Sequence, residues 1–156
     1  MSEKVLLIDD DQDFLNVLSQ RLVIREFDVT TASSVELAFQ LVETQLFDVI
    51  ILDLQMPEMD GLSVLERFIE QKPYLKILLL TGHATVAKGV QAMKLGALDV
   101  LEKPVDIRIL TEKIKVLAQL NNQQQTGDKT PSSPNQPKAI KGLFSKFFGS
   151  RATYTK

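Results

Sequence analysis

The stretch FDVIILDLQMPEMDG, residues 47–61, joins an apolar run to a turn through a single acidic residue. The apolar residues at positions 49–52 are continuous and do not alternate with polar ones, which is typical of a strand buried on both faces. Asp53 ends this run, and a proline-centred turn follows at Pro57. The order raises the question of why an ionisable side chain stands at the end of a core strand.

Four other short apolar runs, at residues 5–8, 27–31, 77–80 and 100–101 with its neighbours, also lie beside turn residues. Between the runs, apolar residues recur at the spacing of a helix, three or four positions apart. This alternation predicts an α/β fold, a parallel sheet with helices on both faces joined by right-handed crossovers. The helical positions are Phe14, Leu15, Leu18 and Leu22; Val35, Leu37, Ala38, Leu41 and Val42; Leu62, Leu65, Phe68 and Ile69; Val86, Val90 and Met93; and Ile109, Leu110, Ile114 and Leu117.

The composition fits one domain with an appendage. The chain has 156 residues, of which 44% are hydrophobic, and it contains no cysteine, which excludes disulfides and thiolate metal sites. The first residues lack the basic region and long apolar stretch of an export signal, and no apolar run approaches the roughly 20 residues of a spanning helix. We therefore expect a cytoplasmic protein, with association to a membrane surface left open.

Charge divides the chain into two parts. Residues 1–120 hold 12 Lys and Arg against 19 Asp and Glu, whereas residues 121–156 hold 6 against 1. The acidic part argues against DNA binding, which needs a concentrated positive surface. We predict a folded domain over residues 1–120, a flexible linker rich in Gln, Asn, Ser and Pro over 121–138, and a short basic amphipathic tail over 139–156.

Polar residues follow the ends of the apolar runs, where ligands bind in an open parallel sheet. Asp9, Asp10 and Asp53 would repel one another unless a cation lay among them. Because only oxygen ligands are on offer, Mg²⁺ is the expected ion, with Mn²⁺ as a substitute. With Thr81 and Lys103 at the next two ends, the set suits phosphoryl transfer to Asp53 as the nucleophile. A capping role alone is the alternative for such aspartates, and we assign it to Asp11 and Asp13, as we do to Ser33 and Ser34 before the second helix.

The pieces VLLIDDD, FDVIILDLQMPEMDG, ILLLTGHA and GALDVLEKP occur in this order, with gaps of 43, 28 and 22 residues between Asp10, Asp53, Thr81 and Lys103. Together they resemble the receiver domain of two-component response regulators, such as the chemotaxis regulators, over roughly residues 4–120. The resemblance implies a flavodoxin-like (βα)5 fold with strand order 2-1-3-4-5.

By the same resemblance, Asp53 accepts a phosphoryl group from a sensor histidine kinase. Asp10 would bind Mg²⁺ directly, Asp9 would help through water, and the backbone carbonyl of Gln55 would be a further ligand. Thr81 and Lys103 would contact the phosphoryl oxygens, and the bond from Lys103 to Pro104 is expected to be cis. No enzymatic activity is expected beyond Mg²⁺-dependent self-phosphorylation and autodephosphorylation.

One position departs from the family. Val100 stands where many members have a Tyr or Phe that changes rotamer together with the Thr. Val cannot swing as a ring does, so we expect weaker coupling to the surface, or coupling through the backbone after Thr81. Pro57 and Gly61 are expected only to shape the loop, and His83 either tunes the lifetime of the acyl phosphate or is a plain loop residue.

We expect a single-domain regulator that signals through phosphorylation-dependent binding of a protein target. The alternatives are a relay intermediate that passes the phosphoryl group to a histidine phosphotransfer protein, and a regulator tethered to a membrane by its tail. A phosphorylation-dependent homodimer, a receiver used only for binding and an FMN-binding redox protein also remain open, although three aspartates would repel the FMN phosphate.

The tail would offer an apolar stripe to a partner groove, to the receiver itself or to a membrane surface, with Lys141 and Lys146 beside it. The stripe comprises Ile140, Leu143, Phe144, Phe147 and Phe148.

Overall fold

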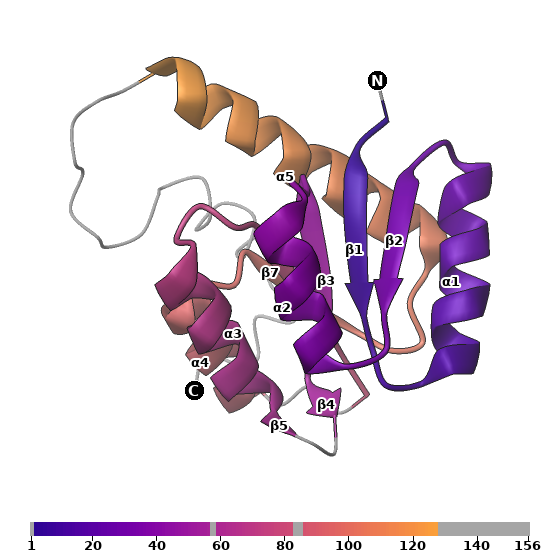
Figure 1. Ribbon diagram of the computed structural model, residues 1–156, viewed down its shortest axis with the longest axis horizontal. Coiled ribbons are helices and arrows are strands. Elements are labelled where there is room, and N and C mark those ends of the chain that lie inside the picture. The colour runs from indigo at the N-terminus through magenta and orange to yellow at the C-terminus, as the bar shows by residue number, and fades with distance from the viewer. Residues whose placement is uncertain (1, 57–58, 83–85, 128–156) are drawn as a thin grey trace.

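A computed structural model describes residues 2–56, 59–82 and 86–127 of the chain. Five strands form one sheet in the order β2-β1-β3-β6-β7, and every neighbouring pair is parallel (Figure 1). Parallel pairing follows from the helix that joins each strand to the next. The strands are β1 (Lys4–Ile8), β2 (Asp28–Ala32), β3 (Val49–Asp53), β6 (Ile77–Thr81) and β7 (Asp99–Glu102).

The expected fold class is confirmed, because these five strands, counted along the chain, stand in the order 2-1-3-4-5. The labels β6 and β7 arise from an additional two-stranded antiparallel sheet, β4 (Gln55–Met56) with β5 (Met59–Asp60), which the sequence pattern did not predict. This β4–β5 hairpin begins two residues after Asp53. Strands β3 and β6 also extend by one residue beyond their apolar runs, so Asp53 and Thr81 are the last residues of their strands.

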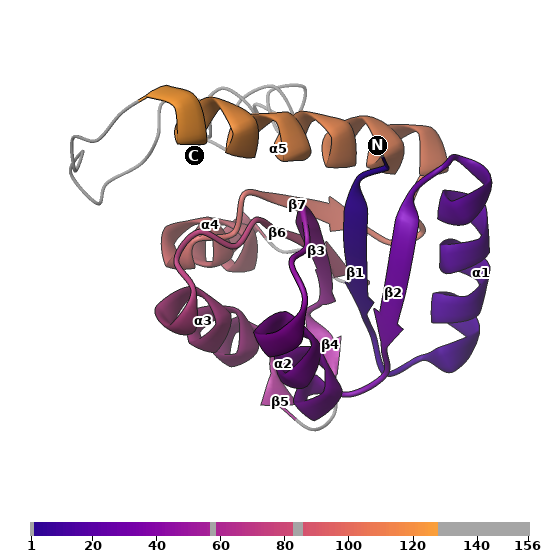
Figure 2. The ribbon, with the colours of Figure 1, turned by 45° about the horizontal axis from the view of Figure 1, so that its top comes forward.

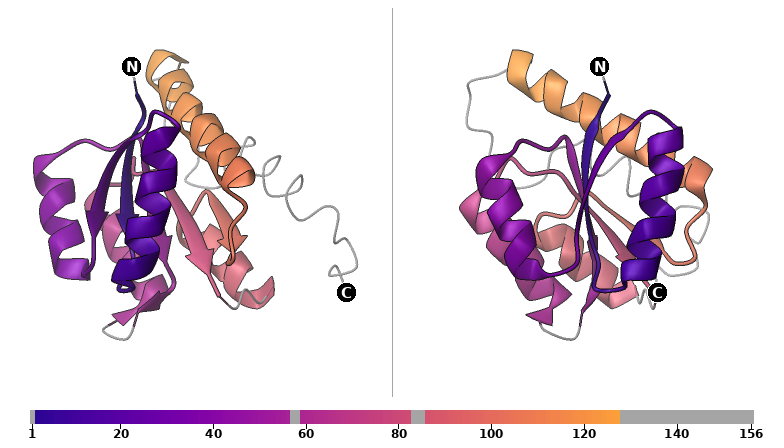
Figure 3. Two further views of the ribbon diagram at one scale, coloured as in Figure 1. Left: turned by 90° about the vertical axis from the view of Figure 1, so that its right-hand side faces the viewer. Right: turned by 45° about the vertical axis from the view of Figure 1, so that its right-hand side comes forward.

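Two apolar cores lie on opposite faces of the sheet. Alternate residues of one strand enter different cores: Ile50 and Leu52 pack on one face, and Val49 and Ile51 on the other. This explains why the strand reads as a continuous apolar run. Helices α1 and α5 cover the second face, while α2, α3 and α4 cover the first (Figures 2 and 3). The helices are α1 (Gln12–Ile24), α2 (Val35–Thr44), α3 (Gly61–Gln71), α4 (Val86–Leu95) and α5 (Ile107–Gly127).

Among the predicted capping residues, Asp11 and Ser34 are the N-caps of their helices. Asp11 is the N-cap of α1, and its carboxylate accepts a hydrogen bond from the backbone N–H of Phe14 at 3.1 Å. Ser34 caps α2 in the same way, accepting from Leu37 at 3.2 Å. Asp13 lies in the first turn of α1, where its charge is favourable near the positive end of the helix.

Helix α5 continues past residue 120, where the linker was predicted to begin, and ends at Gly127. Before that point of α5, the backbone carbonyls of Leu117 and Ala118 accept hydrogen bonds from Nζ of the buried Lys76, at 3.0 and 3.3 Å. Burial lowers the pKa of Lys76 to about 8. Linker residues from 128 onward and the whole predicted tail lie outside the described residues, so the division of the chain into these parts stays a prediction. None of the helices in the described ranges is long and apolar enough to cross a membrane.

Candidate functional site

The carboxyl ends of β1, β3, β6 and β7 bring the predicted site residues to one edge of the sheet. Asp9 follows β1, and its backbone N–H donates to the carbonyl of Ala32 on β2. Asp53 pairs in register with Leu80, so Thr81 is one residue beyond the partner of Asp53 on the neighbouring strand. The backbone N–H of Lys103 donates to the carbonyl of Thr81 at 2.8 Å, which places Lys103 at the same edge.

Three carboxylates meet at this edge. One carboxylate oxygen from each of Asp9, Asp10 and Asp53 lies within 4.8 Å of the others. Asp9 and Asp53 are buried, at 2% and 3% exposure, whereas Asp10 is exposed. The cluster is therefore covered from the protein side and open to solvent through Asp10.

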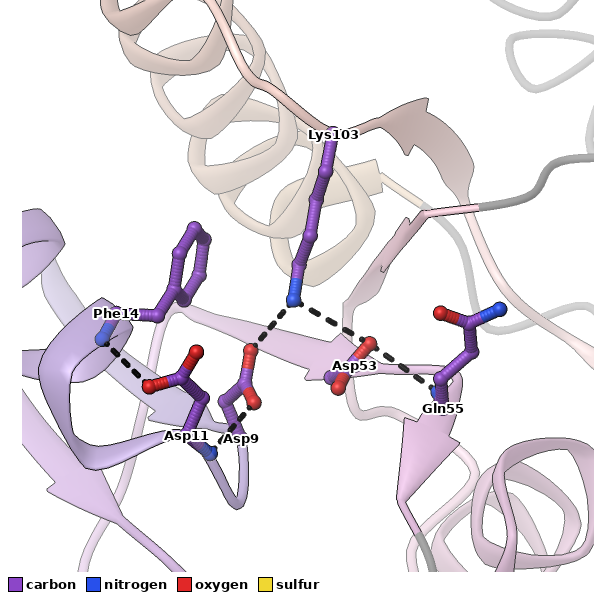
Figure 4. A network of polar contacts seen from close by, with 6 residues as sticks. All are labelled: Asp9, Asp11, Phe14, Asp53, Gln55 and Lys103. Atoms are coloured by element: carbon purple, nitrogen blue, oxygen red, sulfur yellow. Dashed lines mark hydrogen bonds and ion pairs between the residues drawn. The ribbon is translucent and has the colours of Figure 1, made fainter.

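Two aspartates order the loop between β1 and α1. The carboxylate of Asp9 accepts from the backbone N–H of Asp11 at 2.9 Å, and the carboxylate of Asp11 accepts from the N–H of Phe14. Figure 4 shows these two bonds in sequence, from Asp9 to the start of the helix. The two hydrogen bonds thereby fix the position of the Asp9 side chain relative to the first turn of α1.

Lys103 reaches across the site from the segment after β7. Its Nζ lies 2.7 Å from Asp9 Oδ2 and 3.6 Å from Asp53 Oδ1, so one ammonium contacts both buried carboxylates (Figure 4). The peptide bond from Lys103 to Pro104 is cis, as predicted.

Burial raises the pKa of Asp53 to about 6, from an ordinary value of 3.8. The hydrogen bond that its Oδ1 accepts from the backbone N–H of Gln55, at 3.1 Å, opposes this effect. The negative charge of Asp9 raises the pKa further, and the positive charge of Lys103 lowers it. The balance leaves a buried carboxyl with excess negative charge beside it, an arrangement in which a bound cation would be favourable.

The donor set fits Mg²⁺. One carboxylate oxygen from each of three residues lies within 4.8 Å of the others, close enough for the three side chains to approach one cation, and a hard dication prefers such oxygen ligands. Asp9, Asp10 and Asp53 could hold the ion. The backbone carbonyl of Gln55 was predicted as a further ligand, and Gln55 is the first residue of β4, two positions after Asp53.

The described residues thus bring Asp9, Asp10, Asp53, Thr81 and Lys103 to one sheet edge. Thr81 is buried, at 1% exposure, and Val100, at the departure from the family pattern, is buried at 2% in the core under α2, α3 and α4. His83 and Pro57 lie outside the described residues.

Sequence reasoning missed a contact of Lys103. The Lys103 Nζ lies 4.2 Å from the centroid of the Phe14 ring. Phe14 was expected only to form part of the apolar face of its helix. No spacing rule could have found this contact, because it depends on how a residue of α1 meets a side chain that follows β7.

A second missed feature is a buried ion pair beneath α5. Lys113 Nζ lies 2.8 Å from Oδ2 of Asp99, which is 0% exposed and is the first residue of β7. Burial raises the pKa of Asp99, and the hydrogen bond and charge of Lys113 oppose that rise. The pair links α5 to β7, the strand after which Lys103 follows.

Comparison with known proteins gives the same picture. The family model of the response regulator receiver domain matches residues 5–115. The chain is 33% identical to the response regulator protein FleR of Pseudomonas aeruginosa over 129 residues, which cover 81% of this chain and 27% of that protein. It is 32% identical to the photosynthetic apparatus regulatory protein RegA of Rhodobacter capsulatus over 133 residues, covering 85% of this chain and 67% of that protein. The match to FleR thus spans only about a quarter of that relative.

Solved structures agree on the fold. A receiver domain protein from Methanospirillum hungatei, described as CheY-like, superposes with a TM-score of 0.74 at 27% identity, over 80% of this chain and 99% of that one. A receiver domain protein from Clostridium thermocellum gives a TM-score of 0.74 at 31% identity, over 78% and 98%. Family model, relatives and solved structures therefore agree on the family. The chain belongs to the response regulator receiver domain family of two-component signalling.

Proposed function

We propose that Asp53 is the phosphoacceptor of this receiver domain. The observation that carries the proposal is the contact set of Asp53, a buried carboxyl that shares its cluster with Asp9 and Asp10 and lies 3.6 Å from the Lys103 ammonium. A nucleophile here would have carboxylates beside it to hold a metal and a cation beside it to meet the charge of a phosphoryl group.

The proposed donor is the phosphohistidine of a sensor histidine kinase. An oxygen of the ionised Asp53 carboxylate attacks phosphorus, and the P–O bond forms as the P–N bond to the imidazole breaks. The electron pair of the broken bond stays on the imidazole nitrogen, which takes up a proton. Lys103 then pairs with a phosphoryl oxygen, and the Thr81 hydroxyl, at the end of the neighbouring strand, donates to another.

Mg²⁺ held by Asp9, Asp10, Asp53 and the Gln55 carbonyl would supply the positive charge that offsets the repulsion between the carboxylates and the phosphoryl oxygens. Mn²⁺ would serve with the same oxygen ligands. The chain's own part is to keep Asp53 ionised and oriented, through the Gln55 N–H and the Lys103 ammonium.

The proposal is tested by incubating the protein with acetyl phosphate and Mg²⁺ and measuring its intact mass. Wild type should gain one phosphoryl group, and Asp53→Asn should gain none. Asp13→Asn is the matched control, because Asp13 is exposed in the first turn of α1 and should leave the gain unchanged. Uptake by Asp53→Asn equal to that of wild type would rule out Asp53 as the acceptor.

For output, we propose binding of a protein target to the face made by α4, β7 and α5, with a homodimer as one form of such a complex. Lys113 faces β7 through Asp99, and the exposed Ile109 and Val116 lie one turn before and after it on α5. On α4, Val86 and Val90 are also exposed. Apolar side chains around an edge strand suit a protein contact.

A test of this output compares binding partners before and after treatment with acetyl phosphate. Sedimentation of wild type and of Ile109→Glu would detect a phosphorylation-dependent dimer, which the added charge should abolish.

Two further experiments test the alternatives. Transfer of a labelled phosphoryl group to purified histidine phosphotransfer proteins would identify a relay intermediate. Co-sedimentation with anionic vesicles, with and without residues 138–156, tests the membrane role expected for the tail.

A further inference from the structure

We propose that Phe14 is a positioning residue, whose ring holds the Lys103 ammonium between Asp9 and Asp53. The proposal rests on the proposed role of Asp53 as phosphoacceptor. Lys103 Nζ lies 4.2 Å from the centroid of the Phe14 ring, within the range at which the face of an aromatic ring attracts a cation. The same nitrogen lies 2.7 Å from Asp9 Oδ2, so ring and carboxylate contact one ammonium.

The loop after β1 supplies both contacts. Asp9 accepts from the N–H of Asp11, and Asp11 accepts from the N–H of Phe14, so the carboxylate and the ring are held by one short hydrogen-bonded segment. Figure 4 shows the ring of Phe14 and the carboxylates of Asp9 and Asp53 arranged around the end of the Lys103 side chain. The ring and the carboxylate that contact the ammonium are therefore in place before any ligand binds.

The ammonium of Lys103 needs contacts that hold it in place. A lysine side chain has four rotatable methylene groups, and fixing it costs conformational entropy. Its ammonium lies 3.6 Å from Asp53 Oδ1, longer than its contact with Asp9, so Asp9 alone would draw it away from the phosphoacceptor. The ring adds attraction that has no directional hydrogen-bond demand, which leaves the N–H groups free to turn toward a phosphoryl oxygen on Asp53.

Phe14 is also placed to act on the ammonium without belonging to the metal site. It is half-buried and packs against the apolar core that α1 and α5 share with the sheet. Its side chain offers no ligand atom, so its removal leaves the three carboxylates in place. An effect of Phe14 on phosphorylation would therefore act through Lys103.

The test compares Phe14→Leu and Phe14→Tyr with wild type, using acetyl phosphate and Mg²⁺. Phe14→Leu removes the aromatic face at similar bulk and should slow phosphorylation about three- to tenfold, the range expected for one cation–π contact. Phe14→Tyr keeps the face and should stay within about twofold of wild type. Val17→Ala, at an exposed position of the same helix, is the control and should change nothing.

A second measurement does not depend on phosphorylation. In the NMR spectrum, the ε-methylene protons of Lys103 should be shifted upfield by the ring in wild type and in Phe14→Tyr, and should return to ordinary positions in Phe14→Leu. Ordinary positions in wild type, or equal slowing by Leu and Tyr, would overturn the proposal. If wild type took up no phosphoryl group, the proposed function would fail, while the methylene shifts would still decide whether the ring holds the ammonium.

Discussion

At the scale of single residues, the charge state of Asp53 is set by its surroundings. Its folded-state pKa of about 6 lies above the ordinary 3.8, so folding favours its protonated form. The stability that this provides is fully present below about pH 4 and is lost as the pH rises through about 6. In the absence of Mg²⁺, Asp53 at neutral pH is therefore a cost to the fold.

Replacing Asp53 by Asn should stabilise the metal-free protein at pH 8. Each unit of pKa shift corresponds to about 1.4 kcal/mol, so we expect a gain of about 1–3 kcal/mol in the free energy of unfolding. Urea denaturation between pH 4 and pH 8 measures this gain, which should shrink toward zero at the acidic end. A variant no more stable than wild type at pH 8 would show that Lys103 already compensates the charge in full.

Glycine at position 61 is required by the backbone that passes beside it. A Cβ there would lie 2.5 Å from both the Cα and the carbonyl oxygen of Leu54, between Asp53 and the β4–β5 hairpin. Gly61→Ala should therefore cost about 1–3 kcal/mol of stability and slow phosphorylation, because Leu54 and Gln55 must shift. The comparison is Gly82→Ala, whose Cβ would meet only the end of the Gln55 side chain at 3.0 Å. Equal losses for the two variants, by urea denaturation, would argue against a backbone clash.

At the scale of elements, the ion pair between Asp99 and Lys113 joins the edge strand β7 to α5. Lys113→Met would leave a fully buried carboxylate without its cation, which costs about 3–5 kcal/mol in comparable pairs. Because burial already raises the pKa of Asp99, the loss should shrink as the pH falls and the carboxyl takes up a proton.

Urea denaturation at pH 5 and pH 8 measures this loss for Lys113→Met. Lys115→Met is the matched control, since that lysine is exposed on the same helix and should change stability by less than about 0.5 kcal/mol. The double variant with Asp99→Asn should recover part of the loss. A loss independent of pH would mean that packing of the lysine stem, and not the charge of Asp99, is what matters.

The elements were predictable from the sequence to the extent that they are local. The apolar run before Asp53 and the spacing of Leu15, Leu18 and Leu22 identify a buried strand and a helix without any tertiary information. The β4–β5 hairpin escaped prediction because two residues are too short to show a period. The continuation of α5 through residues 121–127 also escaped, because a polar run of Asn and Gln carries no apolar period.

Of the site, the residues at the ends of the strands were predictable from the sequence, whereas the contacts between side chains of separate elements were not. Asp9, Asp10, Asp53, Thr81 and Lys103 could be named as neighbours because parallel strands bring their carboxyl ends to one edge, while their separate roles came from the family resemblance. Phe14 and the pair of Asp99 with Lys113 could not, because these contacts depend on how helices are rotated against the sheet. Contacts between side chains of separate elements require coordinates.

At the scale of the whole molecule, the metal should couple to folding. The cluster draws its carboxylates from β3 and from the loop after β1, so it exists only in the folded chain. Mg²⁺ should therefore raise the free energy of unfolding, by about 2.7 kcal/mol at a concentration 100 times the dissociation constant. If Asp10 is a ligand, as proposed, Asp10→Asn should lower this gain while leaving the metal-free stability almost unchanged, because Asp10 is exposed. Thermal unfolding with and without Mg²⁺ measures both effects, and an equal gain in wild type and variant would exclude Asp10 as a ligand.

The contact of Lys76 with α5 has a consequence for how the chain beyond it behaves. In a helix, the carbonyls of Leu117 and Ala118 would otherwise rely on N–H groups one turn further along. Because a buried ammonium already bonds to both oxygens, unwinding after residue 120 would leave neither of them without a donor. A loss of helix beyond residue 120 would therefore keep both carbonyls bonded, and the contact between α5 and Lys76 would not depend on the turns that follow.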